Sequence, residues 1–234
     1  QFFLIILAGM FIFRKKISQY INMPLLYVAL AVNLVGFYLS YARGALLGFL
    51  IAMPFFFFRR NIKMFAFTVV GILIVSGLAF LFVPKIQGFV FDLDRVTSTN
   101  HRLSQYHAAW KVGLERPFFG LGYRNFEPNV RKLKSKWKIP FEWRGGHGHS
   151  NFFEHLASTG FLGLIAILLF HIFWAWESWR RRDPFGDFCL AFIVALFVSG
   201  QFQYTLGDGE NLFLIMVVYA LSQIKPEILT KTEN

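Results

Sequence analysis

The sequence predicts an all-α integral membrane protein, a multi-helix transmembrane bundle with one large loop that contains amphipathic helices. Of its 234 residues, 56% are hydrophobic and only 16% are charged, whereas soluble domains carry roughly 25% charged residues. Several apolar runs approach the length of about 20 residues that a helix needs to cross a bilayer. Basic clusters separate these runs, so length, hydropathy and charge agree on the fold class.

Seven apolar segments are predicted to be helices, each bounded by charged or turn-forming residues. They are 1–13, 22–40, 42–58, 64–83, 152–176, 186–205 and 211–224. The first is too short to span a bilayer, and it lacks the basic start and the cleavage site of a signal peptide. We therefore expect it to be the end of a helix that starts earlier, and the chain to be the C-terminal part of a longer protein.

Basic residues in the short connections predict the orientation of the helices, because Lys and Arg favour the cytoplasmic side. They occur at 14–16, 59–63 and 180–182 and as Lys225 and Lys231. Strict alternation of the seven helices keeps all of these on the cytoplasmic side. It places three segments on the outer face, namely 40–43, the long loop at 84–151 and the turn 207–210. We treat 1–234 as a single transmembrane domain.

Within the long loop, residues 102–117 are predicted to form an amphipathic helix. Leu103, Tyr106, Trp110 and Leu114 recur at helical spacing, and Pro117 is a stop signal. Such a helix suits the membrane surface, although a simple packing helix has the same pattern. The following residues, 118–128, are rich in glycine and aromatics, and we expect a turn.

Composition also excludes several classes of site and partner. A single cysteine, Cys189, excludes an internal disulfide and a Cys-rich metal site. The net charge of +11 has no nucleic-acid motif beside it, so we expect no nucleic-acid partner and favour phosphate on a lipid-linked substrate. The sequence has no P-loop, serine nucleophile motif or dinucleotide fingerprint, which argues against hydrolases, ATPases and dinucleotide enzymes.

Three residues on the predicted outer face form the candidate catalytic group: Arg43, Arg102 and His149. Two guanidiniums suit a diphosphate because each offers paired N–H donors and a permanent charge. An imidazole can accept a proton near neutral pH. A lone arginine at a helix end can also be an anchor that reaches the headgroups.

Further residues near these three are candidates for substrate binding or support. Arg124, His147 and Asn151 are predicted to bind substrate, and Asp208 and Glu210 to support a histidine or sugar hydroxyls. The alternatives are a solvated turn for the two acids and a capping or backbone contact for the junction residues. His147 and His149 lack the spacing of a zinc site, so we expect neither metal nor cofactor.

Three segments together resemble the O-antigen ligase/polymerase family. Ser40–Leu47 reads S-x-x-R-G-A-L-L, like the family's helix with an essential periplasmic arginine. The second segment has Arg102, Pro117, Gly120, Gly122, Asn125 and Phe126, and the third has His149 with Gly160 eleven residues later. Tyr106 stands where the family usually has tryptophan, and Ser150 where it usually has asparagine.

The resemblance implies a metal-independent, inverting glycosyltransferase of the GT-C type in the bacterial inner membrane, with a cytoplasmic C-terminus. The implied partners are membrane lipids, an undecaprenyl-diphosphate-linked glycan donor and a lipid A-core or glycan acceptor. His149 is the position that it marks as catalytic.

Within the family, the enzyme could be an O-antigen ligase of lipopolysaccharide biosynthesis, a polysaccharide polymerase or a protein O-oligosaccharyltransferase. The basic residues at 131–138 would suit an acceptor that bears phosphates, which favours the ligase, although they could simply be a solvated or headgroup-facing surface. A transporter, or a lipid-linked glycan binder without catalysis, is the alternative from another class.

Overall fold

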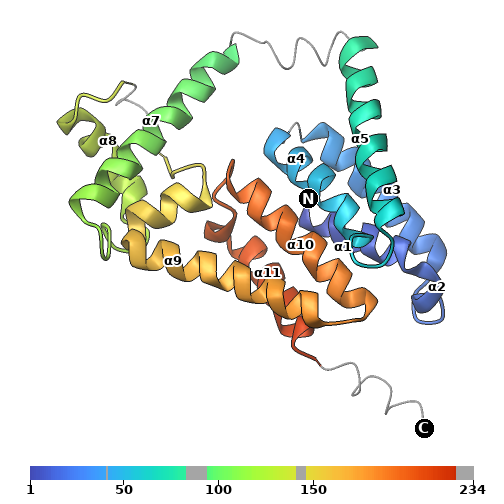
Figure 1. Ribbon diagram of the computed structural model, residues 1–234. Coiled ribbons are helices and arrows are strands. Elements are labelled where there is room, and N and C mark those ends of the chain that lie inside the picture. The colour runs from blue at the N-terminus through green and yellow to red at the C-terminus, as the bar shows by residue number, and fades with distance from the viewer. Residues whose placement is uncertain (41, 83–93, 141–145, 225–234) are drawn as a thin grey trace. The chain divides into compact units, whose positions relative to one another are not determined.

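The computed structural model describes residues 1–40, 42–82, 94–140 and 146–224, and all regular elements in these ranges are helices (Figure 1). They are α1 (Phe2–Ile12), α2 (Arg14–Ile17), α3 (Met23–Leu39), α4 (Arg43–Ala52), η1 (Met53–Phe56), α5 (Ile62–Phe82), α7 (Asp94–Glu115), α8 (Phe126–Lys136), α9 (Asn151–Arg180), α10 (Pro184–Gly200), η2 (Thr205–Gly207) and α11 (Gly209–Ser222).

The seven segments predicted to be helices from hydropathy are confirmed as helical, with ends that shift by a few residues. Among the described residues, α5 and α9 are long and apolar enough to cross a membrane, and the other apolar helices have 10–17 residues. The predicted cytoplasmic residues Lys225 and Lys231 lie outside the described residues.

The chain forms two compact units. The first comprises Gln1–Val69, His171–Ser199 and Leu206–Asn234, and the second comprises Val70–Phe170 and Gly200–Thr205. The described part of the predicted loop at 84–151 therefore belongs to the second unit, together with the start of α9 and the residues that follow α10. The single transmembrane domain stays a prediction.

Aromatic side chains hold the first unit together. The ring of Phe192 on α10 lies 5.4 Å from that of Phe2 on α1 and 6.0 Å from that of Trp174 on α9. The indole N–H of Trp174 donates to the Ser222 hydroxyl at the end of α11 at 3.1 Å. Large aromatic surfaces stabilise such contacts, while the polar edge of a buried indole finds a partner.

A buried ion pair joins two connections that are predicted to be cytoplasmic. Arg59 Nε donates to Asp187 Oδ1 at 2.7 Å, and Arg60 pairs with the other carboxylate oxygen. The Asp187 side chain is fully buried. A carboxylate can be buried between two guanidiniums only while its negative charge stays paired with them.

The other predicted cytoplasmic segments lie at the same end of this unit. The Arg60 guanidinium lies 5.8 Å from the ring of Phe13, directly before the basic cluster at 14–16. Arg181 donates to the carbonyl of Ile224, just past α11, at 2.6 Å. Strict alternation of the seven predicted helices across the membrane requires these basic segments to lie at one end. The side of the membrane on which it lies stays a prediction.

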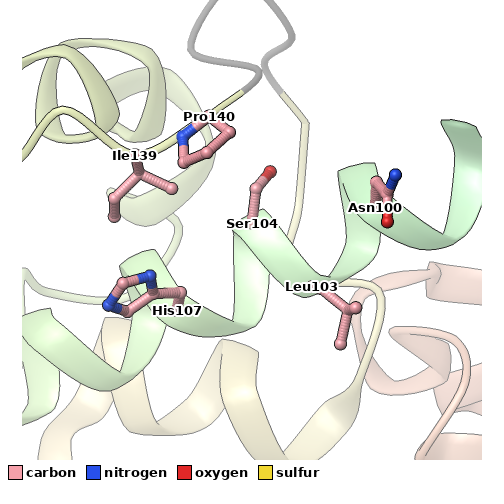
Figure 2. A pocket seen from close by; sticks show the side chains of 6 residues that line it. All are labelled: Asn100, Leu103, Ser104, His107, Ile139 and Pro140. Carbon is pink, nitrogen blue, oxygen red and sulfur yellow. The ribbon is translucent and has the colours of Figure 1, made fainter.

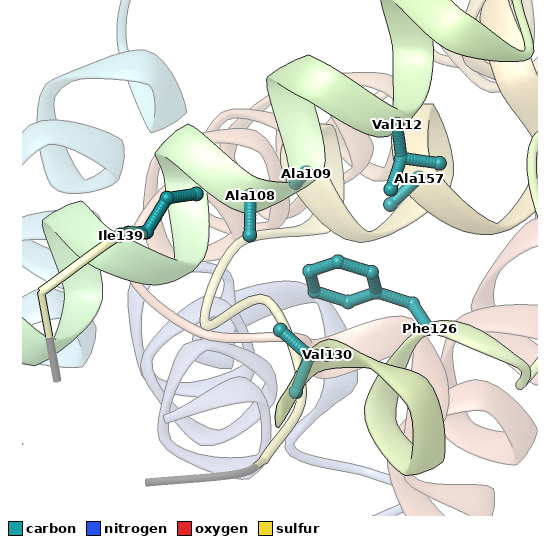
Figure 3. Close-up of a cluster of buried hydrophobic side chains, with 7 residues drawn as sticks. All are labelled: Ala108, Ala109, Val112, Phe126, Val130, Ile139 and Ala157. Atoms are coloured by element: carbon teal, nitrogen blue, oxygen red, sulfur yellow. The ribbon is translucent and has the colours of Figure 1, made fainter. Parts of the chain in front are cut away.

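In the second unit, α7 packs against α8 and the start of α9 around one apolar cluster (Figure 3). Its fully or almost fully buried members are Ala108, Ala109, Val112, Phe126, Val130, Ile139 and Ala157. The side that α7 buries is therefore rich in small residues. The stripe of larger apolar residues is on its exposed side, with Leu103 56%, Trp110 44% and Leu114 60% exposed.

Two details differ from the sequence prediction. The amphipathic helix starts at Asp94 rather than at 102. The basic run that we expected only as part of a loop forms helix α8, which buries Phe126, Val130 and the side chain of Lys134. The end of the segment predicted as a turn, 118–128, is the first turn of α8.

Helix α9 is interrupted at Gly160, where the backbone has φ +69° and ψ −167°. The turn that follows α7 docks into this break: the N–H of Phe161 donates to the Pro117 carbonyl at 2.6 Å, and that of Leu121 to the Ala157 carbonyl at 2.9 Å. The interruption leaves about 20 residues for the second part of α9, which matches the thickness of a bilayer.

Gly160→Ala is expected to destabilise the protein strongly. A Cβ at position 160 would lie 2.5 Å from the carbonyl group of Phe118, and the positive φ is itself unfavourable for alanine. We expect the apparent melting temperature in detergent to fall by about 5 °C or more.

The matched control is Gly77→Ala in α5, where a Cβ would meet no atom within 4 Å. Alanine favours a helix over glycine, so the control should unfold no earlier than the unmodified protein. Equal melting temperatures for the two variants would contradict the close approach at Gly160.

Candidate active site

The turn 147–149 holds the backbone of His149 in a left-handed conformation, with φ +49°. Its N–H donates to Nδ1 of His147 at 3.1 Å, and its carbonyl accepts from the Tyr106 hydroxyl at 3.3 Å. The same hydroxyl lies 3.3 Å from the Gln201 carbonyl, just past α10. A non-glycine residue keeps such a backbone only where its surroundings fix it. His147 in the same turn and Tyr106 on α7 therefore fix the backbone of His149.

A buried carboxylate supports the same turn from α9. Glu154 is 2% exposed, and its Oε2 accepts the backbone N–H of Gly148 at 2.6 Å. Its Oε1 accepts from the Ser158 hydroxyl, one helical turn further on, at 2.9 Å. Charge-assisted hydrogen bonds of this kind are short and strong. Glu154 thus ties the residue between the two histidines to the first turns of α9.

The imidazole of His149 lies among polar rings and offers a buried proton acceptor. Its ring centroid is 4.4 Å from that of His147 and 5.7 Å from that of His101 on α7. Its Nδ1 is buried and has no hydrogen-bond partner among the described residues. A buried polar atom without a partner costs free energy and commonly marks a functional position.

Burial, and after it the positive charge on His147, Arg102 and His101, lowers the pKa of His149 to about 4, while a hydrogen bond with the Gln203 side chain acts in the opposite direction. The ring is therefore uncharged throughout the physiological range. A neutral imidazole can accept a proton or a hydrogen bond from a hydroxyl.

Comparison with known proteins gives one match and one absence. A family model described as O-antigen ligase (Wzy_C) matches residues 26–168. The chain belongs to this family. No curated protein matches the chain. Membership in the O-antigen ligase family, together with the two long apolar helices, indicates a membrane protein with the ligase or polymerase type of glycosyltransferase activity.

The matched part contains the three residues predicted to be catalytic, Arg43, Arg102 and His149. The structure brings Arg102 close enough to His149 to influence its pKa. Arg43 is exposed and begins α4, in the other compact unit. Its convergence with the other two stays a prediction.

Among the residues predicted to bind substrate, Asn151 is buried and His147 and Arg124 are accessible. The Asn151 amide donates to the Thr205 hydroxyl at 2.8 Å, which ties the start of α9 to the segment after α10. Ring nitrogen Nδ1 of His147 is occupied by the His149 N–H. Arg124 is exposed in the turn before α8, at φ +61°.

Asp208 and Glu210 are exposed at the start of α11, in the first unit. Asp208 is the N-cap residue of this helix, and its carboxylate accepts from the Asn211 amide at 3.1 Å. The Asp208 side chain makes no capping hydrogen bond to the backbone of this helix, and Glu210 in the first turn is favourable for the helix dipole. A role for either residue in supporting a histidine stays a prediction.

Sequence reasoning did not assign His101, Glu154 or Gln203 to the site, and it noted Tyr106 only as a helix residue and a departure from the family's usual tryptophan. His101 precedes Arg102 on α7, and Glu154 lies five residues after His149, inside an apolar run. An acid in such a run is costly unless it is hydrogen-bonded. That cost was a usable signal for Glu154. No sequence pattern marked the position of Gln203.

Tyr106→Phe should weaken the hold on His149 without losing the aromatic stack, because the Tyr106 ring lies parallel to that of Phe153 at 4.3 Å. We expect a fall in kcat of about 5- to 20-fold with little change in melting temperature, since one hydrogen bond contributes about 1 kcal/mol.

Tyr106→Trp is the matched variant for this test, because an indole N–H can donate to the same carbonyl and tryptophan is the residue expected at this position from the family resemblance. It should retain more activity than Tyr106→Phe. Equal activity in the two variants would contradict a role for the hydroxyl.

A pH titration tests the environment of His149. NMR of protein with 15N-labelled histidine should give this ring a midpoint near pH 4, well below its ordinary 6.5. Because the folded pKa is lowered, the unfolded chain takes up the proton first as pH falls. The contribution to stability is therefore complete above about pH 6.5 and declines from there towards pH 4.

Arg102→Met should raise the midpoint of His149 by removing one of the charges that lower it. Added inorganic diphosphate should raise the midpoint as well, since an anion stabilises the imidazolium. An ordinary midpoint near pH 6.5 in the unmodified protein would contradict the described burial.

Proposed function

We propose that the protein is a glycosyltransferase that transfers a glycan from undecaprenyl diphosphate to an acceptor hydroxyl at the periplasmic face of the bacterial inner membrane. The proposed reaction is O-antigen ligation onto lipid A-core, with inversion at the anomeric carbon. The observation that carries this proposal is the buried, unpartnered Nδ1 of His149, held in a fixed turn near Arg102 within the part of the chain that matches the O-antigen ligase family.

The transfer exchanges one bond to the anomeric carbon for another. The acceptor oxygen bonds to this carbon while the bond from the carbon to the diphosphate oxygen breaks, and the electron pair leaves with the diphosphate. Nδ1 of His149 takes the acceptor proton. A ring with pKa about 4 is a weak base, so the proton moves late, once the acceptor oxygen has gained positive charge from the new bond.

Arg102 and Arg43 bind the diphosphate in this proposal. Their paired N–H donors match phosphate oxygens, and their charges stabilise the negative charge that develops on the leaving group. The bound diphosphate also offsets the cationic neighbours of His149, which makes the imidazole a stronger base once the donor is in place.

The exposed face of α8 supports lipid A-core as the acceptor. Arg131, Lys132 and Lys136 are exposed on this helix, and Lys138 follows it. Basic residues on one surface attract phosphates that are carried by a lipid. Polymerisation and protein O-glycosylation use the same donor and the same transfer step, so the acceptor assay decides among them.

The first test is His149→Ala, assayed with lipid-linked donor and acceptor in the absence of nucleotide, ions or a gradient. A general base contributes about 10²- to 10⁴-fold to the rate, so the variant without it should have little activity while it still folds. His155→Gln is the control, because it changes a histidine at the same junction whose Nδ1 lies 2.7 Å from the Asn151 carbonyl of its own helix. Full transfer by His149→Ala would refute the assignment.

The second test separates charge from geometry at the donor site. Lysine keeps the charge of arginine but not its planar fork, so Arg102→Lys should raise the KM for the donor by about tenfold. Arg116→Lys, at an exposed arginine just after α7, should leave it unchanged. The same KM in both variants would contradict bidentate binding at Arg102.

A further inference from the structure

The side of α7 that faces away from its buried cluster is itself apolar. Leu103, Trp110 and Leu114 form one exposed stripe along this helix. The turn after α7 continues the stripe, since Phe118 is 66% and Phe119 75% exposed. We refer to these five residues as the exposed apolar surface. Single exposed apolar residues are common, whereas a contiguous patch of large ones marks a site of interaction.

The exposed apolar surface is continuous with the apolar part of α9. The rings of Trp110 and Phe161 lie 6.4 Å apart, with their planes at 84°. Phe161 is the first residue after the break in α9, and its N–H donates to the carbonyl of Pro117, directly before the two exposed phenylalanines. Leu162, the next residue of α9, is half exposed. The apolar surface of α7 therefore runs directly into the segment that is long enough to cross a membrane.

The form of the surface also favours a bilayer over a protein partner. A pocket of about 240 Å³ lies beside it, between α7 and the residues that follow α8 (Figure 2). Of the exposed apolar surface, only Leu103 lines this pocket. A helical partner is usually held in an apolar groove. A bilayer needs no groove, because acyl chains fill the space around side chains that project.

The residues that border the exposed apolar surface suit lipid headgroups. Arg116 and Arg124 are exposed near the two ends of the segment between α7 and α8. Tyr123 is exposed in the same segment, and tyrosine and tryptophan are enriched where hydrocarbon meets headgroups. The acidic neighbour, Glu115, is paired with Lys136 at 3.2 Å. A basic border beside an apolar face is typical of helices that lie on anionic membranes.

We propose that α7 and the turn after it lie in the interface of the membrane, on the side where the apolar part of α9 begins. The exposed apolar surface contacts acyl chains, and Arg116 and Arg124 contact anionic headgroups. Because Tyr106 of the same helix donates to the carbonyl of His149, the depth of α7 sets the height of this imidazole at the headgroup level. That level is where a lipid carries its diphosphate. This consequence for the reaction rests on the proposed function, whereas the contact with lipid does not.

The test is the accessibility of a spin label on the full chain, reconstituted in nanodiscs of phosphatidylethanolamine and phosphatidylglycerol. Cys189, the single cysteine, is replaced by alanine, and a nitroxide is attached to Phe119→Cys. Oxygen concentrates in hydrocarbon and a neutral nickel chelate in water, so this label should collide mainly with oxygen. Lys132→Cys, at an exposed position of α8, is the matched control, and its label should collide mainly with the chelate.

Two outcomes would overturn the proposal. Collision mainly with the chelate at position 119 would mean that the surface faces water. Exclusion of both reagents there would mean that protein, such as a second copy of the chain, covers it. Where Cys189→Ala does not fold, quenching of tryptophan fluorescence by brominated lipids replaces the labels. Trp110→Phe should then remove emission that these lipids quench, and removal of unquenched emission only would equally overturn the proposal.

The membrane contact and the proposed reaction fail separately. His149→Ala should leave the accessibility of the label at position 119 unchanged. If the protein transfers glycan but this label prefers the chelate, the membrane contact is wrong and the reaction stands. If the label contacts lipid but the unmodified protein transfers no glycan from the lipid-linked donor, the reaction is wrong and the membrane contact stands.

Discussion

The docking of the turn after α7 into the break at Gly160 is the contact on which the second unit depends. Two backbone hydrogen bonds, from Phe161 to Pro117 and from Leu121 to Ala157, replace the helical bonds that the break removes. They are possible only because glycine stands on both sides of the contact: a Cβ at Gly120 would lie 2.4 Å from the Ala157 carbonyl oxygen. The chain thereby gains a rigid platform just before an apolar span.

The platform explains how a loop can support chemistry. The part of α9 before the break carries Glu154 and Asn151, and these fix the turn 147–149 and the segment after α10. Tyr106 fixes the same turn from α7. Since His147 accepts from the N–H of His149 and Tyr106 donates to its carbonyl, the half-buried ring can remain neutral and ready to accept a proton before any substrate arrives. Such preorganisation lowers the reorganisation needed during the reaction.

Sequence patterns predict the parts of this fold that depend on large apolar side chains. Hydropathy predicted the apolar helices, and the family resemblance singled out Gly120, Gly122 and Gly160, of which Gly120 and Gly160 meet in the structure. Hydropathy did not predict which side of α7 is buried. Small residues such as Ala108, Ala109 and Gly113 allow helices to approach closely, and hydropathy scales give them little weight. A Cβ on Gly113, for instance, would lie 2.7 Å from the Leu156 side chain. The partners of His149 were missed since contacts between distant segments leave no local spacing.

The ion pair between Asp187 and the two arginines Arg59 and Arg60 bears on how the protein is made as well as on how it is held. On the predicted topology, positive residues at such a connection steer the orientation of a nascent helix hairpin, and Asp187 is synthesised more than 100 residues later. On that topology, the same guanidiniums serve first as orientation signals for insertion and later as the counter-charge for Asp187 at the start of α10. The connection between η1 and α5 therefore gains its counter-charge only after the start of α10 has been synthesised.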